Sequence, residues 1–585
     1  MLPKRSNVME IRTCQNCKRD FNIEDEDFSF YEKMKVPAPT FCSDCRMIRR
    51  MLWRNERSLY HRECAATGKK VISCFSPESG ITVYDRDYWW SDEWDVFQFG
   101  KDYDFSKPFF TQFNELLHSV PLPNLFNGRC VNSSYSNHVG EMKNAYLTFA
   151  AWISENIMYS AKVGDSKECV DCLSAVHDDL CYESITINHC SRVFFSKNCE
   201  SCLDSWFLYD CSGCSNCFGC ANLRNKSYCI FNVQYSREEY LKEIEKLNLS
   251  SLSSLNFIKQ KCEEFWKNSL HRFAFLKKTI DCTGDNLLEM KNCKNCFGAY
   301  NNISDSKYCI NAVGKMSDTY DAYGPGLAEL MYEIVDSGDR AQLLLGTIVT
   351  WNCVRTSYSY NCHGSSDLFG CIGLRNKKHC IFNKQYTEEE YKELLPKIKQ
   401  HMHDMPYVDL KGRKFEYGDF FPYDFSPFCY NETIAHEYFP QDESYVLSQG
   451  FKWKSSDKKS HDITIDGKDI PDIIPENTEE LIKETIACLN KGDTKTKCTL
   501  AYKLTPEELI FYKRFNLPLP QYCPNCRYYN RMLKTNPPKL WHRSCMCTKE
   551  NHGHEGSCKN EFETSYSPDR KEIVYCESCY QKEVL

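Results

Sequence analysis

Cysteines recur every nine residues through the middle of the chain, and this spacing constrains the fold more than any other feature. The recurring positions are Cys172, Cys181, Cys190 and Cys199, then Cys202, Cys211, Cys220 and Cys229, and later Cys353, Cys362, Cys371 and Cys380. One straight strand cannot carry such a series, because side chains alternate between its two faces and an odd step changes face. We therefore predict a coiled chain with two nine-residue halves, or about 18 residues, in each coil, so that each cysteine lies above its equivalent in the next coil.

The second and third series belong to two copies of one segment, offset by 151 residues. Leu223-Arg224-Asn225-Lys226 recurs as Leu374-Arg375-Asn376-Lys377, and a partial third copy occupies residues 295–310. Short β-rich pieces at 184–187, 193–195, 207–209 and 228–231 alternate with polar Ser, Asn, Asp and Gly corners. The sequence thus predicts a mainly β fold whose centre is a cysteine-rich parallel β-solenoid, with each rung buried on its neighbours.

The densest cysteine run, residues 210–220, also has the spacing of an iron–sulfur ligand run. Its sister segment carries Ser365 and Leu368 in place of Cys214 and Cys217, although the surrounding pattern persists. A cluster would not survive the loss of half its ligands. We therefore interpret Cys211 and Cys220 as small buried solenoid residues, and only Cys214 and Cys217 remain candidates for metal binding.

Both long copies end in a helix-start signal. Ser236 and Thr387 are each followed three residues later by a glutamate, Glu239 and Glu390, which forms a capping box. Helices are predicted at 236–247, 255–278, 326–337 and 387–401, where they would cover open solenoid ends or edges. Residues 407–449 are expected to be irregular but ordered, and 452–477 to form a polar linker.

The N-terminus carries a separate cysteine motif with zinc-ribbon spacing, Cys14-x-x-Cys17 followed by Cys42-x-x-Cys45. Four thiolates in two pairs satisfy tetrahedral Zn²⁺. The motif recurs near the C-terminus at an offset of 481, as Cys498, Cys523 and Cys526. Lys495 stands where the first copy has Cys14, so this second site has three thiols, and its fourth ligand comes from elsewhere or the site is empty.

A further site is predicted at the extreme C-terminus. Cys576 and Cys579 are expected to bind metal with two of Cys545, Cys547 and Cys558, and His552 and His554 are alternative ligands. The corresponding N-terminal segment keeps Cys64 and Cys74 but has Asp85 and Tyr88 in place of the last cysteine pair. The two copies have therefore lost ligands at complementary places.

These terminal segments resemble the family of probable zinc-ribbon domains with a treble-clef-like plan. The resemblance rests on residues 14–46, where Cys-x-x-Cys and a phenylalanine precede an acidic stretch, Phe-Tyr and Pro-x-x-Cys-x-x-Cys-Arg. It covers about 45 residues at each end and implies zinc binding without implying a reaction. The whole chain also looks like large uncharacterised cysteine-rich proteins of reduced-genome bacteria, which have no function to carry over.

Arginines follow both zinc-ribbon motifs and suggest an alternative function. They are Arg46, Arg50, Arg54 and Arg57 in the first copy, and Arg527 and Arg531 in the second. A basic helix can lie along nucleic-acid phosphates. The competing interpretation is a solvated helix whose arginines pair with the acidic run at residues 24–27.

A solenoid enzyme acting on a polymer or carbohydrate is a second alternative. Its candidate carboxylates are Asp178, Asp179, Glu183, Asp204 and Asp210. Acid–base hydrolysis needs two carboxyl groups at a fixed separation in a groove, which one sequence does not show, and the lack of a secretion signal argues against an extracellular polysaccharide substrate. The sequence therefore favours a protein without catalytic activity.

Composition favours a cytoplasmic protein. The first residues contain no apolar run typical of a signal peptide, and no stretch is apolar enough for a membrane span. In a reducing compartment, the 37 cysteines indicate metal sites or buried thiols rather than disulfides. The net charge of -7 argues against a globally basic protein that coats nucleic acid.

The sequence thus predicts zinc-ribbon modules at 8–100 and 481–585 around solenoid parts at 125–235 and 281–385. A helical insert at 236–280, a capping helix at 386–403 and an irregular linker at 404–480 complete the chain. We expect about two to three Zn²⁺ per chain and no iron, from counting closed four-ligand sites. The expected function is a scaffold or adaptor that recognises a macromolecular partner, either protein or nucleic acid (RNA or DNA). We expect no association with a membrane.

Overall fold

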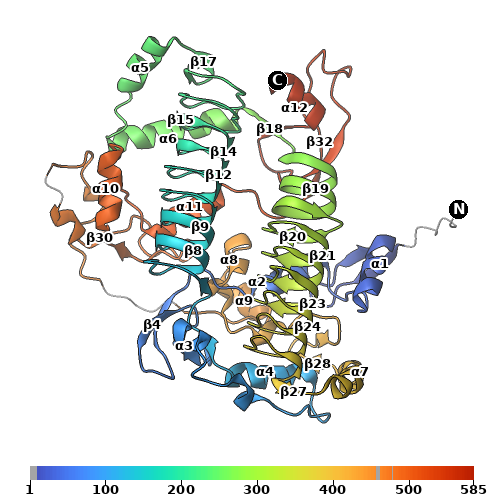
Figure 1. Ribbon diagram of the computed structural model, residues 1–585. Helices are drawn as coiled ribbons and strands as arrows, with labels where there is room; N and C mark the ends of the chain where they lie inside the picture. Colours follow the sequence, from blue (N-terminus) through green and yellow to red (C-terminus); the bar gives the residue numbers. More distant parts are fainter. Residues whose placement is uncertain (1–8, 456–460, 477–478, 585) are drawn as a thin grey trace.

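The structure is a computed structural model that describes residues 9–455, 461–476 and 479–584. Two β-solenoids stand side by side, and small modules from both ends of the chain pack around them (Figure 1). The chain climbs through the first solenoid and descends through the second, and His138 of the first lies 2.8 Å from Asp336 of the second. The prediction of a mainly β fold with a central parallel solenoid is confirmed.

Each turn of solenoid 1 contains 12 residues, so the predicted coil of about 18 residues is wrong. Leu173 lies opposite Ile185, and Ile185 lies opposite Lys197. Solenoid 2 mixes 13-residue turns, such as Lys307 opposite Tyr320, with 12-residue turns, such as Ser366 opposite Lys378. Every third residue of solenoid 1 has a left-handed backbone, as at Thr186, His189, Arg192 and Phe195. The chain therefore bends after three residues, and nine residues are three sides of a four-sided turn.

The narrow interior explains why cysteine and serine fill it. Carbonyl groups at the corners need donors, because an unpaired buried carbonyl costs free energy. Cys211 Sγ lies 3.5 Å from the Tyr209 carbonyl oxygen and 3.8 Å from that of Cys220. Ser160 Oγ donates to Met158 O at 2.9 Å and accepts from the Cys172 amide at 2.9 Å. The nine-residue cysteine spacing thus covers three sides of a turn, because inward positions recur every third residue.

Cys214 and Cys217 belong to the same interior. Their sulfurs lie 3.6 Å and 3.4 Å from the carbonyl oxygens of Ser212 and Ser215, respectively. Among the described residues, neither sulfur belongs to a group of side chains placed to hold a metal ion. These two thiols therefore serve as core donors, like Cys211 and Cys220.

Most solenoid strands are short because each occupies one or a few sides of a turn, whereas β19, with 29 residues, runs through more than two turns. Solenoid 1 comprises β7 (Asn127–Gly128), β8 (Asn137–Tyr146), β9 (Phe149–Met158), β10 (Ala161–Gly164), β11 (Leu173–Val176), β12 (Ile185–Asn188), β13 (Ser191–Phe194), β14 (Lys197–Glu200), β15 (Leu203–Trp206), β16 (Cys229–Ile230) and β17 (Val233–Gln234). Solenoid 2 comprises β19 (Leu276–Ser304), β20 (Lys307–Ile310), β21 (Met316–Tyr323), β22 (Ala328–Val335), β23 (Ala341–Ile348), β24 (Val354–Ser357), β25 (Ser366–Phe369), β26 (Lys378–Ile381) and β27 (Lys384–Gln385). The predicted helix at 326–337 is wrong, since β22 occupies it and pairs on both sides.

Both predicted capping boxes are confirmed. Ser236 caps α5 (Arg237–Glu245) and Thr387 caps α7 (Glu388–Asp404), each after the last solenoid turn. The helix expected at 255–278 is α6 (Leu252–Lys267), which starts earlier and ends sooner. It stops because residues 270–272 form the strand β18 (Leu270–Arg272), which pairs with the C-terminal region.

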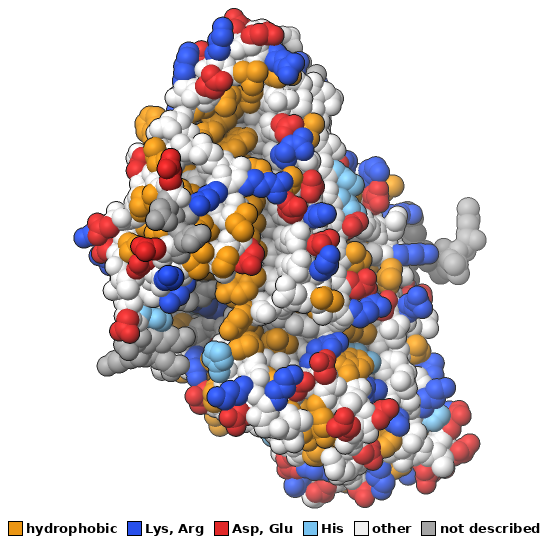
Figure 2. Space-filling view, turned by 60° about the vertical axis from the view of Figure 1, so that its left-hand side comes forward, with side chains coloured by type: hydrophobic (Ala, Val, Ile, Leu, Met, Phe, Trp, Pro, Cys, Tyr) orange, Lys and Arg blue, Asp and Glu red, His pale blue; other side chains and the backbone are white. Residues whose placement is uncertain are grey.

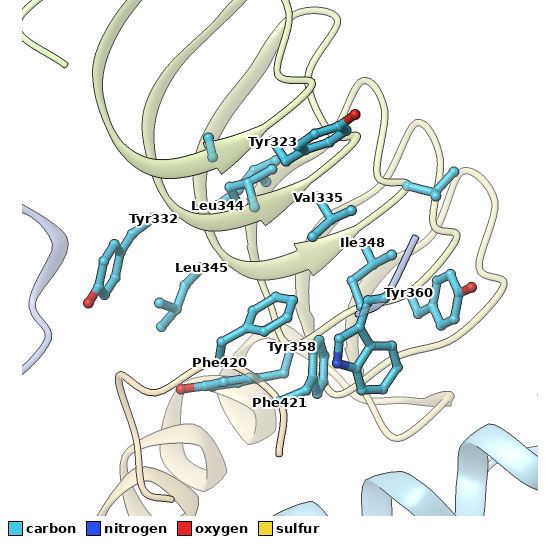
Figure 3. Packing of buried hydrophobic residues seen from close by; sticks show 14 of the residues in the cluster. Tyr323, Tyr332, Val335, Leu344, Leu345, Ile348, Tyr358, Tyr360, Phe420 and Phe421 are labelled. Atoms are coloured by element: carbon cyan, nitrogen blue, oxygen red, sulfur yellow. The ribbon is translucent and has the colours of Figure 1, made fainter. Parts of the chain in front are cut away.

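The segment after α7 is ordered by packing on solenoid 2. It contains the hairpin β28 (Tyr407–Val408) and β29 (Lys414–Phe415) and the short helices α8 (Ile434–Tyr438) and α9 (Glu443–Ser448). Phe420 and Phe421 lie against the solenoid beside Tyr358 (Figure 3). The centre of the Phe421 ring lies 6.0 Å from that of Tyr358 and 5.0 Å from that of Trp53. Part of the predicted linker, residues 456–460 and 477, lies outside the described residues.

Four small modules share one plan, a hairpin followed by a helix. Module 1 is β1 (Glu10–Thr13), β2 (Asp20–Ile23), α1 (Asp25–Met34) and α2 (Ser43–Met51), and module 2 is β3 (Tyr60–Glu63), β4 (Lys70–Ser73), β5 (Val83–Tyr84) and α3 (Arg86–Trp90). Module 3 is β30 (Ile486–Ala487), β31 (Ala501–Tyr502), α10 (Pro506–Arg514) and α11 (Pro524–Leu533), and module 4 is β32 (Trp541–Ser544), β33 (Glu561–Thr564), β34 (Ile573–Tyr575) and α12 (Glu577–Val584). Helix α4 (Phe109–Ser119) and β6 (Leu122–Pro123) link module 2 to solenoid 1.

The modules are attached to the solenoids in a crossed arrangement. Module 2 lies at the start of solenoid 1, where β5 pairs with β6, and module 4 lies at the start of solenoid 2, where β34 pairs with β18. Modules 1 and 3 reach across: α2 packs on β21 and β22 of solenoid 2, whereas α11 packs on β11 of solenoid 1. Each end of the chain is thereby tied to both solenoids.

Candidate metal centres and the arginine clamps

The first cysteine cluster joins both pairs predicted for module 1. The sulfurs of Cys14, Cys17, Cys42 and Cys45 all lie within 4.8 Å of one another, and Cys17 Sγ is 3.7 Å from Cys42 Sγ. A tetrahedral Zn²⁺ with Zn–S bonds of about 2.3 Å separates its sulfurs by about 3.8 Å. Cys42 precedes α2 and Cys45 lies in its first turn, where the helix dipole favours negative thiolates. The cluster can therefore hold a tetrahedral metal ion.

The second cluster contains a cysteine that the sequence interpretation missed. Cys488 joins Cys498, Cys523 and Cys526, with Cys488 Sγ 3.7 Å from Cys526 Sγ. Cys488 Sγ accepts the Cys523 amide at 3.3 Å, as Cys14 Sγ accepts the Cys42 amide at 3.2 Å. Cys488 is thus the counterpart of Cys14. The constant offset of 481 pairs Cys14 with Lys495 instead, because the loop between β30 and β31 is longer than the loop between β1 and β2.

The third cluster resolves the alternatives left open in module 4. Cys545, Cys558, Cys576 and Cys579 come together, and Cys545 Sγ accepts the Cys576 amide at 3.2 Å. The same hydrogen bond therefore marks all three four-cysteine clusters. Cys547, His552 and His554 form a fourth group that again includes Cys579.

Module 2 has the plan of the other three modules without their ligands. Cys64 occupies the position of Cys545, but Asp85 and Tyr88 stand at the helix start where module 4 has Cys576 and Cys579. Cys74 lies in the apolar core, where burial raises the pKa of its thiol. Within the described part of the chain, module 2 contributes no residue to a metal-binding group.

A fifth group of metal-type ligands is explained by a lysine. Glu24, Glu26 and Asp27 surround the ammonium of Lys307, at 2.9 Å from Glu24 and 2.8 Å from Asp27. Burial would lower the pKa of Lys307, but these carboxylates raise it above its ordinary value. The acidic run at 24–27 therefore binds solenoid 2, and its predicted pairing with the arginines of module 1 is wrong.

The arginines after the first cluster are buried rather than exposed to phosphates. Arg46 and Arg50 both contact Asp321, at 2.9 Å and 3.0 Å. Arg50 also lies 3.0 Å from Glu333, and Arg49 lies 2.7 Å from the same carboxylate. All five side chains are at most 3% exposed. We call this set, Arg46, Arg49, Arg50, Asp321 and Glu333, the first arginine clamp.

Module 3 forms the second arginine clamp on solenoid 1, from Arg527, Arg531, Asp171 and Glu508. Arg531 lies 2.7 Å from Asp171, and Arg527 lies 2.8 Å from Glu508 and 3.4 Å from Asp171. The Arg527 guanidinium covers the Tyr159 ring at 4.6 Å, as that of Arg46 covers Tyr308 at 5.5 Å. The two clamps are therefore equivalent features of the duplicated chain.

The two remaining arginine candidates are also engaged. Arg54 contacts Asp336 at 2.7 Å and Glu56 at 2.6 Å. Burial would raise the pKa of Asp336, but Arg54 and His138 lower it to about 2. Arg57 stacks on Tyr528, 3.7 Å from the ring centre. The arginines considered for phosphate binding are therefore engaged within the fold, and Figure 2 shows basic and acidic side chains interspersed over the visible face.

The carboxylates considered for acid–base chemistry are engaged elsewhere. Glu183 pairs with Lys259 at 2.7 Å, and Asp204 pairs with Arg192. Asp210 contacts Arg224 at 2.9 Å and accepts from the Tyr580 hydroxyl at 2.6 Å. Asp178 lies inside solenoid 1, where burial raises its pKa to about 7. Glu183, Asp204 and Asp210 are therefore held in ion pairs within the fold, and Asp178 is enclosed in the solenoid.

Comparisons with known proteins add no assignment. No protein-family model matches the chain, and no curated protein matches it. Among the described residues, no helix combines the length and apolar character that crossing a bilayer requires. The cysteine clusters and the solenoids therefore carry the functional argument.

Proposed function

We propose that this protein is a zinc-dependent scaffold whose stacked solenoid turns present a surface to a macromolecular partner. Its cysteine clusters bind Zn²⁺ in treble-clef-like modules, as the resemblance of the terminal segments implies. Four thiolates without an open coordination position are typical of structural zinc sites rather than catalytic ones. The free state of the cysteines supports a reducing compartment such as the cytoplasm.

The observation that carries this proposal is the position of the two arginine clamps. Each follows directly from a cysteine cluster, because Cys45 and Arg46 are neighbours on α2, as Cys526 and Arg527 are on α11. A metal ion that fixes the start of the helix also fixes the arginines that reach the opposite solenoid. Zinc would thereby hold together parts of the chain that are far apart in sequence.

A protein partner is favoured over nucleic acid. The arginines that suggested RNA or DNA binding are buried in ion pairs or stacked on aromatic rings. Phosphate binding by a protein depends on accessible cationic groups and weakens steeply with salt. Retention on a nucleic-acid column that falls with salt would restore the alternative, and we expect no such retention.

Elemental analysis of the untagged full chain tests the metal proposal. We expect at least one zinc ion for each of modules 1, 3 and 4, and no iron. Chelation should then increase amide hydrogen exchange in α2 and α11, since both helices start at metal ligands. A protein that contains no zinc, or whose α2 and α11 stay protected after complete metal removal, would contradict a structural role.

A further inference from the structure

The ligand groups of module 4 exceed what one metal ion can use. One group is Cys545, Cys558, Cys576 and Cys579, and the other is Cys547, His552, His554 and Cys579. Two tetrahedral ions that share one ligand need seven ligand atoms, and the two groups supply seven with Cys579 in common. We propose that module 4 holds a dinuclear zinc cluster in which the Cys579 thiolate bridges the two ions. This inference rests on the proposed zinc binding and extends it.

The distances in the second group fit a metal site. Cys547 Sγ lies 3.2 Å from His552 Nδ1, and Cys579 Sγ lies 3.5 Å from His554 Nε2. With Zn–S bonds of about 2.3 Å and Zn–N bonds of about 2.05 Å, a tetrahedral ion places sulfur and nitrogen about 3.6 Å apart. The four ligand atoms are thus gathered closely enough to surround one ion.

Both histidines are also oriented as metal ligands usually are. His552 directs its other nitrogen, Nε2, to the Glu583 carboxylate at 3.1 Å. His554 directs Nδ1 to the Gly556 carbonyl oxygen at 2.9 Å. A carboxylate or carbonyl partner fixes the ring tautomer and turns the opposite nitrogen toward the metal.

Module 3 provides an internal comparison. Its loop between Cys488 and Cys498 is also extended, but residues 489–497 contain no cysteine or histidine. Module 4 places Cys547, His552 and His554 in the corresponding loop between Cys545 and Cys558. Loop length alone therefore does not account for these three ligands, and module 3 is expected to bind one ion where module 4 binds two.

Native mass spectrometry of the zinc-loaded full chain tests the proposal. We expect four zinc ions per chain, three in Cys547→Ser or His554→Ala, and two in Cys579→Ser. Cys498→Ser should lose one ion from module 3, and the solenoid variant Cys130→Ser should keep all four. If the wild type bound three ions and Cys547→Ser bound the same number, the second site in module 4 would be contradicted. If Cys579→Ser lost only one ion, the bridging role of Cys579 would be contradicted.

A second measurement covers the case in which Cys579→Ser fails to fold. In wild-type protein loaded with ¹¹³Cd, two of the cadmium resonances should be coupled to each other through the shared sulfur. Uncoupled resonances would contradict the bridge. If modules 1 and 3 also bound no metal, the proposed zinc-dependent function would be contradicted. That result differs from uncoupled resonances, which contradict only the bridge.

Discussion

The two arginine clamps occupy equivalent places but bury different numbers of charges. The first joins three arginines to Asp321 and Glu333, whereas the second has Asn530 in place of Arg49. Glu183, one turn after Asp171 as Glu333 is one turn after Asp321, turns to Lys259 of α6. Both copies therefore keep a helix from a cysteine-rich module packed on the opposite solenoid, whereas the ion pairs around that helix differ between the copies.

The largest effect should come from the first clamp. Glu333→Ala leaves Arg49 and part of Arg50 buried without a carboxylate, and removing one partner of a buried ion pair costs about 3–5 kcal/mol. Chemical denaturation measures the loss. The matched control is Glu329→Ala, which changes an exposed glutamate on β22. Its free energy of unfolding should lie within about 0.5 kcal/mol of wild type. Equal stability of the two variants would contradict the clamp.

The second clamp should be less sensitive. Asp171→Ala removes the carboxylate of Arg531, but Glu508 still holds Arg527 at 2.8 Å. We expect a loss at the lower end of the range for broken buried pairs, about 3 kcal/mol. A larger loss than in Glu333→Ala, measured by the same denaturation, would reverse the proposed order of the clamps.

A buried acid should make solenoid 1 depend on pH. Asp178 has a folded-state pKa of about 7, raised by burial above its ordinary value of 3.8. The folded protein therefore loses stability as pH rises from about 4 to about 7, by an amount on the order of 2–4 kcal/mol. Asp178→Ser, which copies Ser154 and Ser166 in the same inward row, should be more stable than wild type at pH 8 and similar at pH 3.5.

That prediction is checked by denaturation at both pH values. Asp179→Ser is the matched control, because it changes the adjacent carboxylate and leaves the row of inward side chains intact. A profile that is identical in wild type and Asp178→Ser would show that Asp178 ionises freely in the fold.

The smallest expected effects concern the two helix caps. Ser236→Ala and Thr387→Ala each remove a side-chain acceptor for the amide of the glutamate three residues later. A lost N-cap costs about 1 kcal/mol. We expect the larger loss for Thr387→Ala, because α7 buries Ile398 and Met402, whereas only Tyr240 is buried in α5. Circular dichroism during thermal unfolding compares the two.

Features that depend on local chemistry could be predicted from the sequence. The capping boxes, the parallel solenoid and the cluster of Cys14, Cys17, Cys42 and Cys45 all follow from short spacings. The turn length did not, because inward side chains recur every third residue, so a nine-residue cysteine spacing covers three sides of a turn while backbones pair twelve residues ahead. The cysteine period therefore reflects three sides of the turn and not the length of the whole turn.

Long-range partners were beyond the sequence interpretation. Arg46 and Asp321 are 275 residues apart, and nothing local distinguishes an arginine that pairs across the fold from one that meets solvent. Cys488 was missed for a different reason, since a lengthened loop moved it out of the repeat register. A search for any cysteine upstream of Cys498, without fixed spacing, could have found it.

The central claim is that each metal-bound module stabilises the solenoid on the other side of the molecule. Hydrogen exchange of single-ligand variants tests this most directly. Cys45→Ser should lower protection at residues 316–335 of solenoid 2, and Cys526→Ser should lower it at residues 157–176 of solenoid 1. If each variant instead loosens only its own module, or the solenoid nearest in sequence, the crossed arrangement is not what the metal sites stabilise.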